Sequence, residues 1–214
     1  MIDTKLLRGW LGWLGMLLPI IVLILCLICG YGIPDSISAT YYLAPTITPF
    51  MIILGASSIL LICYKGYDRQ DNIVCTLAGI FGLCICLFPC NTKGLIEHWI
   101  EVTFPTYVGT FQLHVKISGI LHNISAISFF GLLAYNSYFL FTKGSATPTQ
   151  NKKKRNIIFK VCGIGMMVSF MLIIPVSILE IWGGVWLIET FALGFFGISW
   201  LTKSQIHRWL FKDV

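Results

Sequence analysis

The chain has 214 residues, of which 57% are hydrophobic and only 11% are charged, and its mean hydropathy is +0.83. This composition excludes a soluble globular protein and is typical of an integral membrane protein. A transmembrane helix needs about 20 apolar residues, so a chain of this length can hold about six of them and no separate soluble domain. We therefore expect residues 1–214 to form a single transmembrane helical bundle.

Six apolar segments follow one another along the chain, each close to spanning length. They cover residues 10–32, 46–64, 73–90, 115–141, 157–179 and 182–201. A membrane β-barrel would need segments of roughly 10 residues in which polar and apolar side chains alternate. Continuous apolar runs such as residues 17–29 do not alternate. The predicted fold class is therefore all-α, a polytopic membrane protein with six transmembrane helices.

The basic residues predict the orientation of the bundle. Of the 15 Lys and Arg residues, 13 fall on one side of the predicted topology, and Lys93 and Lys116 fall on the other. Because cytoplasmic loops carry an excess of Lys and Arg, we expect an N-in and C-in protein of the cell membrane, with both termini cytoplasmic.

The distribution of charge also predicts partners. The net charge of +6 is dispersed over the membrane flanks, which favours membrane lipids as partners and excludes nucleic acid. Residues 144–156 are expected to form a basic cytoplasmic loop, in which the run Lys152–Arg155 is either a solvated stretch or a polybasic site for anionic lipids. No sequence pattern determines an oligomeric state.

Polar side chains gather in the outer half of the bundle, at one depth and on one helix face. His122 lies about 12 Å along the fourth span from its outer end, and Glu189 lies roughly 10 Å along the sixth. On the fourth span, His114, Ser118, His122 and Ser125 are spaced by four, four and three residues, which places them on one face. Since ionisable groups cost about 2.5 to 3.5 kcal/mol at such depths, this face should line the bundle interior or a water-filled cavity.

The segment before the second span is expected to cover this polar region. Residues 34–42 provide several hydroxyl groups, among them Ser36 and Ser38, and one carboxylate. We expect them to form an ordered cap over the outer mouth. The candidate ligand-binding pocket therefore consists of Ser36, Ser38, Ser118, His122, Ser125 and Glu189.

Several interpretations of this polar cluster remain open. His122 and Glu189 could hydrogen-bond each other or nearby Ser and Asn side chains and so hold helices together. The cluster could instead bind a lipid headgroup or a small polar molecule without chemistry. A third interpretation is a metal-dependent lipid hydrolase, in which His114, His122 and Glu189 bind zinc or another divalent metal and activate a water. A channel or transporter is the fourth.

The chain contains eight cysteines, and most lie within apolar spans, where a thiol behaves as a small hydrophobic group. They add no metal-binding pattern to the histidines.

The loop between the second and third spans carries alternating charges. Asp68, Arg69 and Asp71 follow Lys65 in this stretch. Asp71 is placed to cap the third helix by accepting hydrogen bonds from free amides. Asp68 and Arg69 could make a fixed ion pair with another inner loop, which would hold two helical hairpins together.

Several short motifs in the middle of the chain resemble a known family. These motifs are Ser36-Ile37-Ser38-Ala39-Thr40-Tyr41-Tyr42, Tyr64-x-Gly66-Tyr67-Asp68-x-x-Asp71-Asn72, Leu87-Phe88-Pro89 and Leu121-His122-x-x-x-Ala126-x-x-Phe129-Phe130. They resemble a bacterial family of uncharacterised six-span proteins, which is distantly similar to the damage-regulated autophagy modulator and Sfk-type membrane proteins. The resemblance covers residues 34–142, implies six spans and a link to lipid handling, and implies no catalytic role. Ser36, Ser38, Asp68, Asp71 and His122 are the positions that match.

Overall fold

The computed structural model describes residues 3–91, 106–144 and 149–205. It contains six long helices: α1 (Thr4–Ile28), α2 (Ala44–Cys63), α3 (Arg69–Leu87), α4 (Val115–Tyr135), α5 (Gln150–Ile178) and α6 (Gly184–Ser204). A short 3-10 helix, η1 (Ser38–Tyr42), precedes α2, and a π-helical turn, η2 (Asn136–Leu140), continues α4. A two-stranded antiparallel hairpin, β1 (Tyr107–Val108) and β2 (Leu113–His114), precedes α4.

All six predicted spans are present. Each of the six helices, with η2 counted as part of α4, is long and apolar enough to cross a membrane. Isoleucine side chains such as Ile120, Ile124 and Ile198 are exposed along their outer faces, as expected of surfaces that face hydrocarbon. The all-α six-helix fold predicted from composition and segment length is confirmed.

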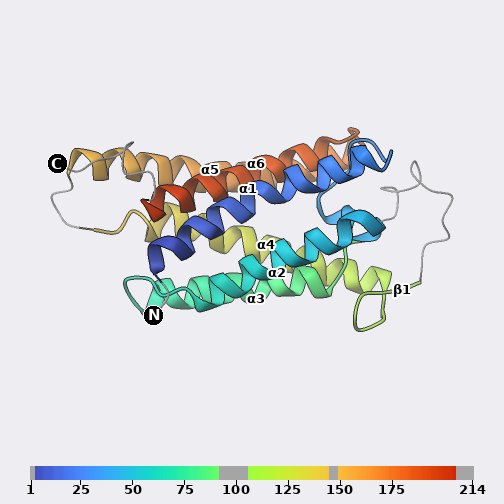
Figure 1. Ribbon diagram of the computed structural model, residues 1–214, viewed down its shortest axis with the longest axis horizontal. Coiled ribbons are helices and arrows are strands. Elements are labelled where there is room, and N and C mark those ends of the chain that lie inside the picture. Colours follow the sequence, from blue (N-terminus) through green and yellow to red (C-terminus); the bar gives the residue numbers. More distant parts are fainter. Residues whose placement is uncertain (1–2, 92–105, 145–148, 206–214) are drawn as a thin grey trace.

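The helices form a ring in sequence order (Figure 1). Each helix packs against the next one in the chain, and α1 packs against α6, which closes the ring. The closing contact depends on small residues: a Cβ atom on Gly12 would lie 2.9 Å from the carbonyl oxygen of Gly197. Such residues let helix backbones approach closely, and this close packing drives the association of helices in lipid, which is as apolar as their side chains.

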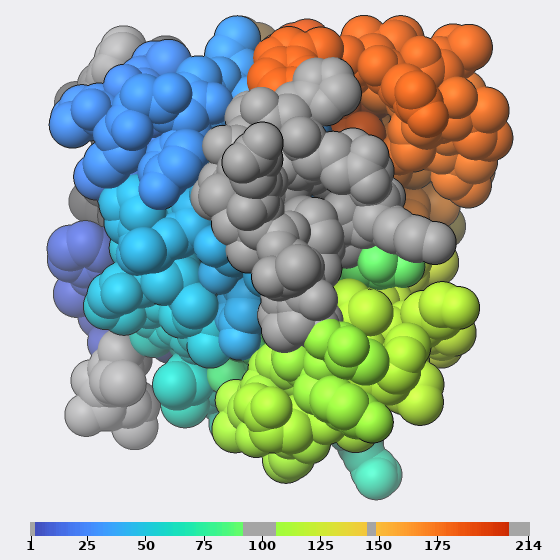
Figure 2. Space-filling model, turned by 90° about the vertical axis from the view of Figure 1, so that its right-hand side faces the viewer, coloured from blue at the N-terminus to red at the C-terminus, as the bar shows by residue number. Residues whose placement is uncertain are grey.

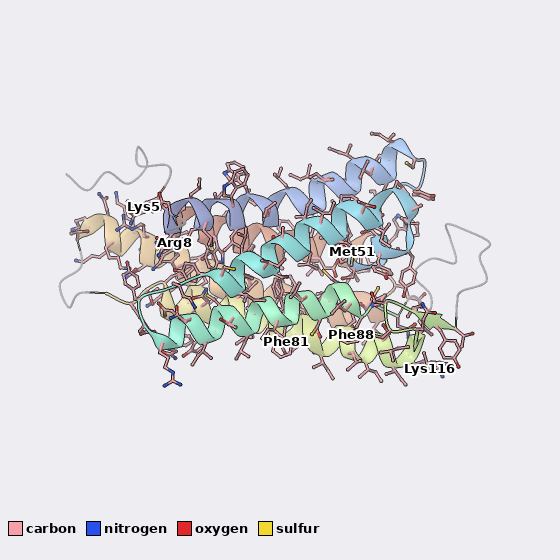
Figure 3. The ribbon with its side chains drawn as sticks, turned by 60° about the horizontal axis from the view of Figure 1, so that its bottom comes forward. Lys5, Arg8, Met51, Phe81, Phe88 and Lys116 are labelled. Atoms are coloured by element: carbon pink, nitrogen blue, oxygen red, sulfur yellow. The ribbon has the colours of Figure 1, made fainter. Side chains whose placement is uncertain are left out.

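The two ends of the bundle differ in character. Figure 3 shows Lys5 and Arg8 at one end and Phe88 and Lys116 at the other. Of the 12 Lys and Arg residues in the described ranges, 11 belong to the first end, which we call the basic end. The other end carries η1 and the β-hairpin (Figure 1); we call it the cavity end.

The structure corrects the predicted basic loop. Helix α5 begins at Gln150, with the Thr149 hydroxyl accepting a hydrogen bond from the Lys152 amide at 3.3 Å. Residues 150–156 are therefore helical and do not form a loop. The helix divides the run Lys152–Arg155 between two faces, because Lys153 and Lys154 are exposed whereas Arg155 is buried.

Candidate functional site

A cavity of about 460 Å³ opens within the bundle at the cavity end. Cavities that bind small molecules typically measure about 300 to 1,000 Å³. Its walls come from the helices α1 to α6 and from the segment that leads into η1. The lining residues that the argument uses are Ser36, Ser38, His122, Ala126, Phe170 and Glu189.

Glu189 is held by the segment that leads into η1. The Ile37 amide donates a hydrogen bond to Glu189 Oε2, and Ser38 donates from both its amide and its hydroxyl. A second contact joins α6 to this segment, since the Trp186 amide donates to the Asp35 carbonyl oxygen at 2.8 Å. The carboxylate thus accepts hydrogen bonds from three donors of the cap and also faces the cavity.

His122 is held from the opposite side, by the end of α3. Its Nδ1 lies 2.8 Å from the Phe88 carbonyl oxygen, and the side chain is buried. A carbonyl can only accept, so Nδ1 carries a proton in this contact. One turn earlier on α4, the Ser118 hydroxyl donates to the Pro89 carbonyl oxygen at 2.8 Å. These two hydrogen bonds join α4 to the end of α3.

The predicted cap is present, and it is anchored on both sides. The Ser36 hydroxyl accepts a hydrogen bond from the Ala39 amide at 2.9 Å, which starts the turn of η1. The Tyr42 hydroxyl donates to the Cys90 carbonyl oxygen at 2.7 Å. Ser36 and Ser38 line the cavity as expected.

The structure brings four of the six predicted pocket residues to the cavity wall and leaves two beside it. Ser36, Ser38, His122 and Glu189 line the cavity, whereas Ser118 and Ser125 are buried in the bundle interior. His122 and Glu189 do not bond each other, since His122 contacts the Phe88 carbonyl oxygen and Glu189 accepts from the Ile37 amide; the predicted alternative of a nearby serine holds for Glu189, which also accepts from the Ser38 hydroxyl. Asn91, Asn123 and Ser177 also line the cavity, and the last of these was missed because one serine in an apolar helix gives no pattern.

The structure does not bring the three predicted metal ligands, His114, His122 and Glu189, together. His114 lies at the N-terminus of α4, where its Nδ1 accepts a hydrogen bond from the Lys116 amide at 3.3 Å and its ring packs edge-on against Tyr107. It does not line the cavity that His122 and Glu189 share. Within residues 3–91, 106–144 and 149–205, no three His, Cys, Asp or Glu side chains come together as a metal site.

The cavity reaches the molecular surface between α4 and α5, where lining residues of both helices are exposed. Toward the basic end these helices touch, because a Cβ atom on Gly163 would lie 3.0 Å from the Ala134 carbonyl oxygen. The rings of Phe130 and Phe170 still meet, with centroids 5.8 Å apart. Beyond them, Ile127 and Ile178 line the cavity and are 56% and 75% exposed. In Figure 2, which views the cavity end, the orange atoms of the α5–α6 turn lie at the upper right and the yellow-green atoms of the β-hairpin and the start of α4 lie at the lower right.

The cavity carries acidic rather than basic character. Among its described lining residues Glu189 is the single carboxylate, and none is Lys or Arg. Most of the remaining wall is aliphatic or aromatic. The part of the cavity lined by Ala126 and Phe170 therefore suits an apolar chain, and the part beside Glu189 suits a group that donates hydrogen bonds.

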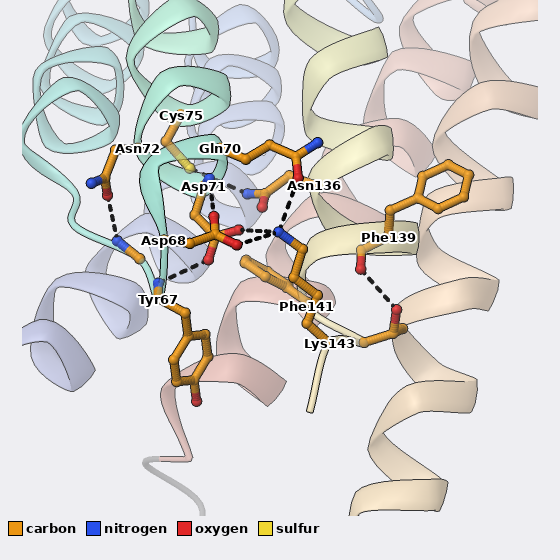
Figure 4. A network of polar contacts seen from close by, with 12 residues as sticks. Tyr67, Asp68, Gln70, Asp71, Asn72, Cys75, Asn136, Phe139, Phe141 and Lys143 are labelled. Atoms are coloured by element: carbon orange, nitrogen blue, oxygen red, sulfur yellow. Dashed lines mark hydrogen bonds and ion pairs between the residues drawn. The ribbon is translucent and has the colours of Figure 1, made fainter. Parts of the chain in front are cut away.

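A polar network joins two loops at the basic end (Figure 4). Lys143 contacts Asp68 at 2.8 Å and Asp71 at 3.3 Å, and it also donates to Gln70. The hydrogen bond from Lys143 holds the pKa of Asp68 below its ordinary value, and the same bond raises the pKa of Lys143. The predicted ion pair between inner loops is therefore present for Asp68, whereas Arg69 takes no part in it.

The cap of α3 differs from the prediction. Asp68 is the N-cap residue and accepts a hydrogen bond from the Asp71 amide at 3.0 Å. Asp71 instead accepts from the Tyr67 amide at 2.8 Å and is buried. The helix begins earlier than the apolar pattern indicates, because polar residues form its first turn.

Comparisons of the chain with protein-family models, with curated proteins and with solved structures found no match.

Proposed function

We propose that the protein is a multi-pass protein of the cell membrane that binds a lipid or a small polar ligand in the cavity. The observation that carries this proposal is the pairing of a half-buried carboxylate, Glu189, with an apolar chamber of about 460 Å³. An ionisable group at such depth in a membrane helix requires either a partner or a function. Glu189 has backbone partners, but no cation is among the described residues of its cavity.

The chemistry of the walls favours an amphiphilic ligand. Its polar end would donate hydrogen bonds, from hydroxyl or amine groups, to Glu189, with Ser36 and Ser38 beside it. Its apolar part would lie against Ala126, Phe130 and Phe170. The opening between α4 and α5 supports entry from the membrane, because exposed isoleucines flank it on both sides.

The orientation is part of the proposal. The basic end carries 11 of the 12 described Lys and Arg residues, and such ends face the cytoplasm. The cavity would then open into the outer leaflet, with the N-terminus and the end of α6 on the cytoplasmic side.

The proposal is tested with a substitution that fills part of the cavity and leaves its polar residues unchanged. Ala126→Trp places a large side chain in the cavity wall, whereas Ile124→Trp changes an exposed position on the same helix that is 52% exposed. Both proteins are purified in mild detergent, and the co-purifying small molecules are extracted and quantified by mass spectrometry. We expect a species that is present in wild type and in Ile124→Trp and is depleted in Ala126→Trp. Equal content in all three proteins would refute the proposal.

A further inference from the structure

A second group of charged residues lies at the basic end, far from the cavity. Aromatic rings form its centre: Phe141 and Tyr64 each meet Trp200 edge-on, with centroids 5.0 and 5.1 Å apart, and Phe141 meets Phe159 at 5.4 Å. Three cations lie over these rings. We call the group the cation–aromatic cluster; its members are Arg8, Tyr64, Tyr67, Phe141, Lys152, Phe159, Trp200 and Lys203.

Two ammonium groups of the cluster are close to each other. Lys152 Nζ lies 3.0 Å and Lys203 Nζ 3.5 Å from the same oxygen, the carbonyl of Phe141. The two nitrogens are therefore no more than 6.5 Å apart, the sum of these distances. Both also lie over the Phe159 ring, at 5.9 and 5.8 Å from its centroid. Like charges at this separation destabilise each other unless an opposite charge lies between them.

The described part of the chain offers little negative charge here. Arg8 lies over the Tyr64 ring at 5.4 Å, and Lys203 is close enough to Arg8, Lys152 and Arg155 to experience their charge. The one carboxylate acting on Lys203 is Asp71, which already receives hydrogen bonds from Lys143 and from the Tyr67 amide.

Lys203 has few hydrogen-bond partners for a buried ammonium. Lys203 is only 7% exposed, and its hydrogen bond to the Phe141 carbonyl oxygen is long, at 3.5 Å. An ammonium has three donors. The remaining contacts are with the faces of aromatic rings, Phe141 at 4.7 Å and Tyr67 at 4.9 Å. These attract a cation but do not take its protons as an oxygen does.

We propose that the cation–aromatic cluster binds a phosphate group, supplied by the headgroup of an anionic phospholipid in the adjoining leaflet. A phosphate oxygen between Lys152 and Lys203 would provide the missing acceptor and the missing negative charge. Basic pockets between transmembrane helices near the membrane surface are suited to phosphate-bearing headgroups. The site is independent of the cavity, which lies at the opposite end of the bundle.

The position of Tyr67 makes the site reachable. Its ring lies over the Lys203 ammonium and is itself 75% exposed, so the ammonium lies one aromatic ring beneath the surface. Lys152 is half-buried in the first turn of α5. A headgroup at the membrane surface would reach both ammonium groups once the Tyr67 side chain changes rotamer.

The test measures lipid binding by native mass spectrometry of purified protein at about 0.3 M salt, where exposed charges are largely screened. Dioleoyl phosphatidic acid is the probe, and dioleoylglycerol, which has the same chains and no phosphate, is the control lipid. The variants are Lys203→Met and Lys152→Met, each of which keeps an unbranched side chain and removes the charge. Lys154→Met removes an equal charge from an exposed position on α5 and is the control variant.

We expect wild type to prefer phosphatidic acid over dioleoylglycerol. Each cluster variant should bind phosphatidic acid about tenfold more weakly, and Lys154→Met should bind it as wild type does. Competition by inorganic phosphate would identify the free ion as a ligand of the same site, whereas binding of the lipid alone would assign the site to membrane headgroups. Equal binding by Lys203→Met, Lys152→Met and Lys154→Met would overturn the proposal, as would absence of a preference in wild type. If Lys203→Met fails to fold, the half-buried Lys152 supplies the same comparison.

Discussion

Glu189 has a structural role that can be separated from ligand binding by two substitutions. Its carboxylate accepts a hydrogen bond from the Ile37 amide, and Ile37 is buried. Glu189→Ala removes the acceptor and leaves this amide without its partner, which costs about 1 to 3 kcal/mol. Glu189→Gln keeps an acceptor oxygen at the same place and removes only the charge.

These costs translate into melting temperatures. For a chain of 150 to 250 residues, 1 kcal/mol shifts Tm by about 2 to 4 °C. We therefore expect Glu189→Ala to lower the melting temperature by roughly 3 to 10 °C. Glu189→Gln should lower the melting temperature by less than about 3 °C, because an uncharged hydrogen bond replaces a charge-assisted one and a half-buried charge is no longer partly desolvated.

The assay is thermal unfolding of the purified proteins in one detergent, followed by intrinsic fluorescence. Glu180→Gln is the control, since it removes a carboxylate from an exposed position in the α5–α6 turn, and we expect no change in Tm. Both Glu189 variants should retain less of the co-purifying ligand, because a donor group of the ligand binds a carboxylate more strongly than an amide oxygen or no acceptor at all. If Glu189→Ala melts at the temperature of wild type, the carboxylate does not hold the cap and the reasoning is wrong.

Three other predictions concern packing, pH and thiol reactivity. Gly197→Ala should destabilise the protein by about 1 to 3 kcal/mol in thermal unfolding, because the new Cβ would lie 2.8 Å from a carbonyl oxygen of α1, whereas Gly194→Ala, with no atom within 4 Å, should be neutral or stabilising. Lys143→Met should lower stability modestly between about pH 4 and about pH 10 and have no effect well outside that range. The lowered pKa of Asp68 contributes stability in full at pH values above the ordinary pKa of an aspartate, and this contribution is lost as the pH falls. The raised pKa of Lys143 contributes stability in full at pH values below the ordinary pKa of a lysine, and this contribution is lost as the pH rises. A pH-independent effect would refute this. Burial raises the pKa of the Cys90 thiol to about 12, so at neutral pH this cysteine should be alkylated far more slowly than the exposed cysteines, as peptide mapping would show; equal rates would contradict the burial.

The sequence predicts the helices well because each is specified by its own composition. Long apolar runs determine where the chain can cross a membrane, and the structure has six helices that are long and apolar enough to do so. The boundaries were less predictable, because polar residues can form the first turn of a membrane helix. Gln150 and Arg69 each begin a helix several residues before the apolar pattern does, with Thr149 and Asp68 as caps.

The candidate site was predictable in depth and face but not in its contacts. Spacing along α4 places His122 inward, and distance from the helix end places Glu189 at the same level; both line the cavity. Their partners are backbone groups of Ile37 and Phe88. Main-chain donors and acceptors are present at every residue, so only the packing of the helices decides which of them meet a given side chain.

For His114, the spacing along α4 predicted the wrong surroundings. Its spacing on α4 continues the polar stripe, yet it caps the helix and packs against Tyr107. Likewise, Lys203 near the end of an apolar helix suggests a side chain that reaches the membrane surface. The structure buries it among rings from the loop after α2, from the loop after η2 and from α5, an arrangement that depends on segments far apart in the chain.

Photo-crosslinking tests the central claim most directly, because it reports which molecule lies in the cavity. A benzophenone amino acid replaces Phe170, which lines the cavity, or Met171, which is 65% exposed on the same helix. After irradiation in native membranes, the adducts are identified by mass spectrometry. We expect one dominant adduct at Phe170 and a mixture in the proportions of the bulk lipids at Met171. The same mixture at both positions, or no adduct at Phe170, would contradict a specific ligand in the cavity.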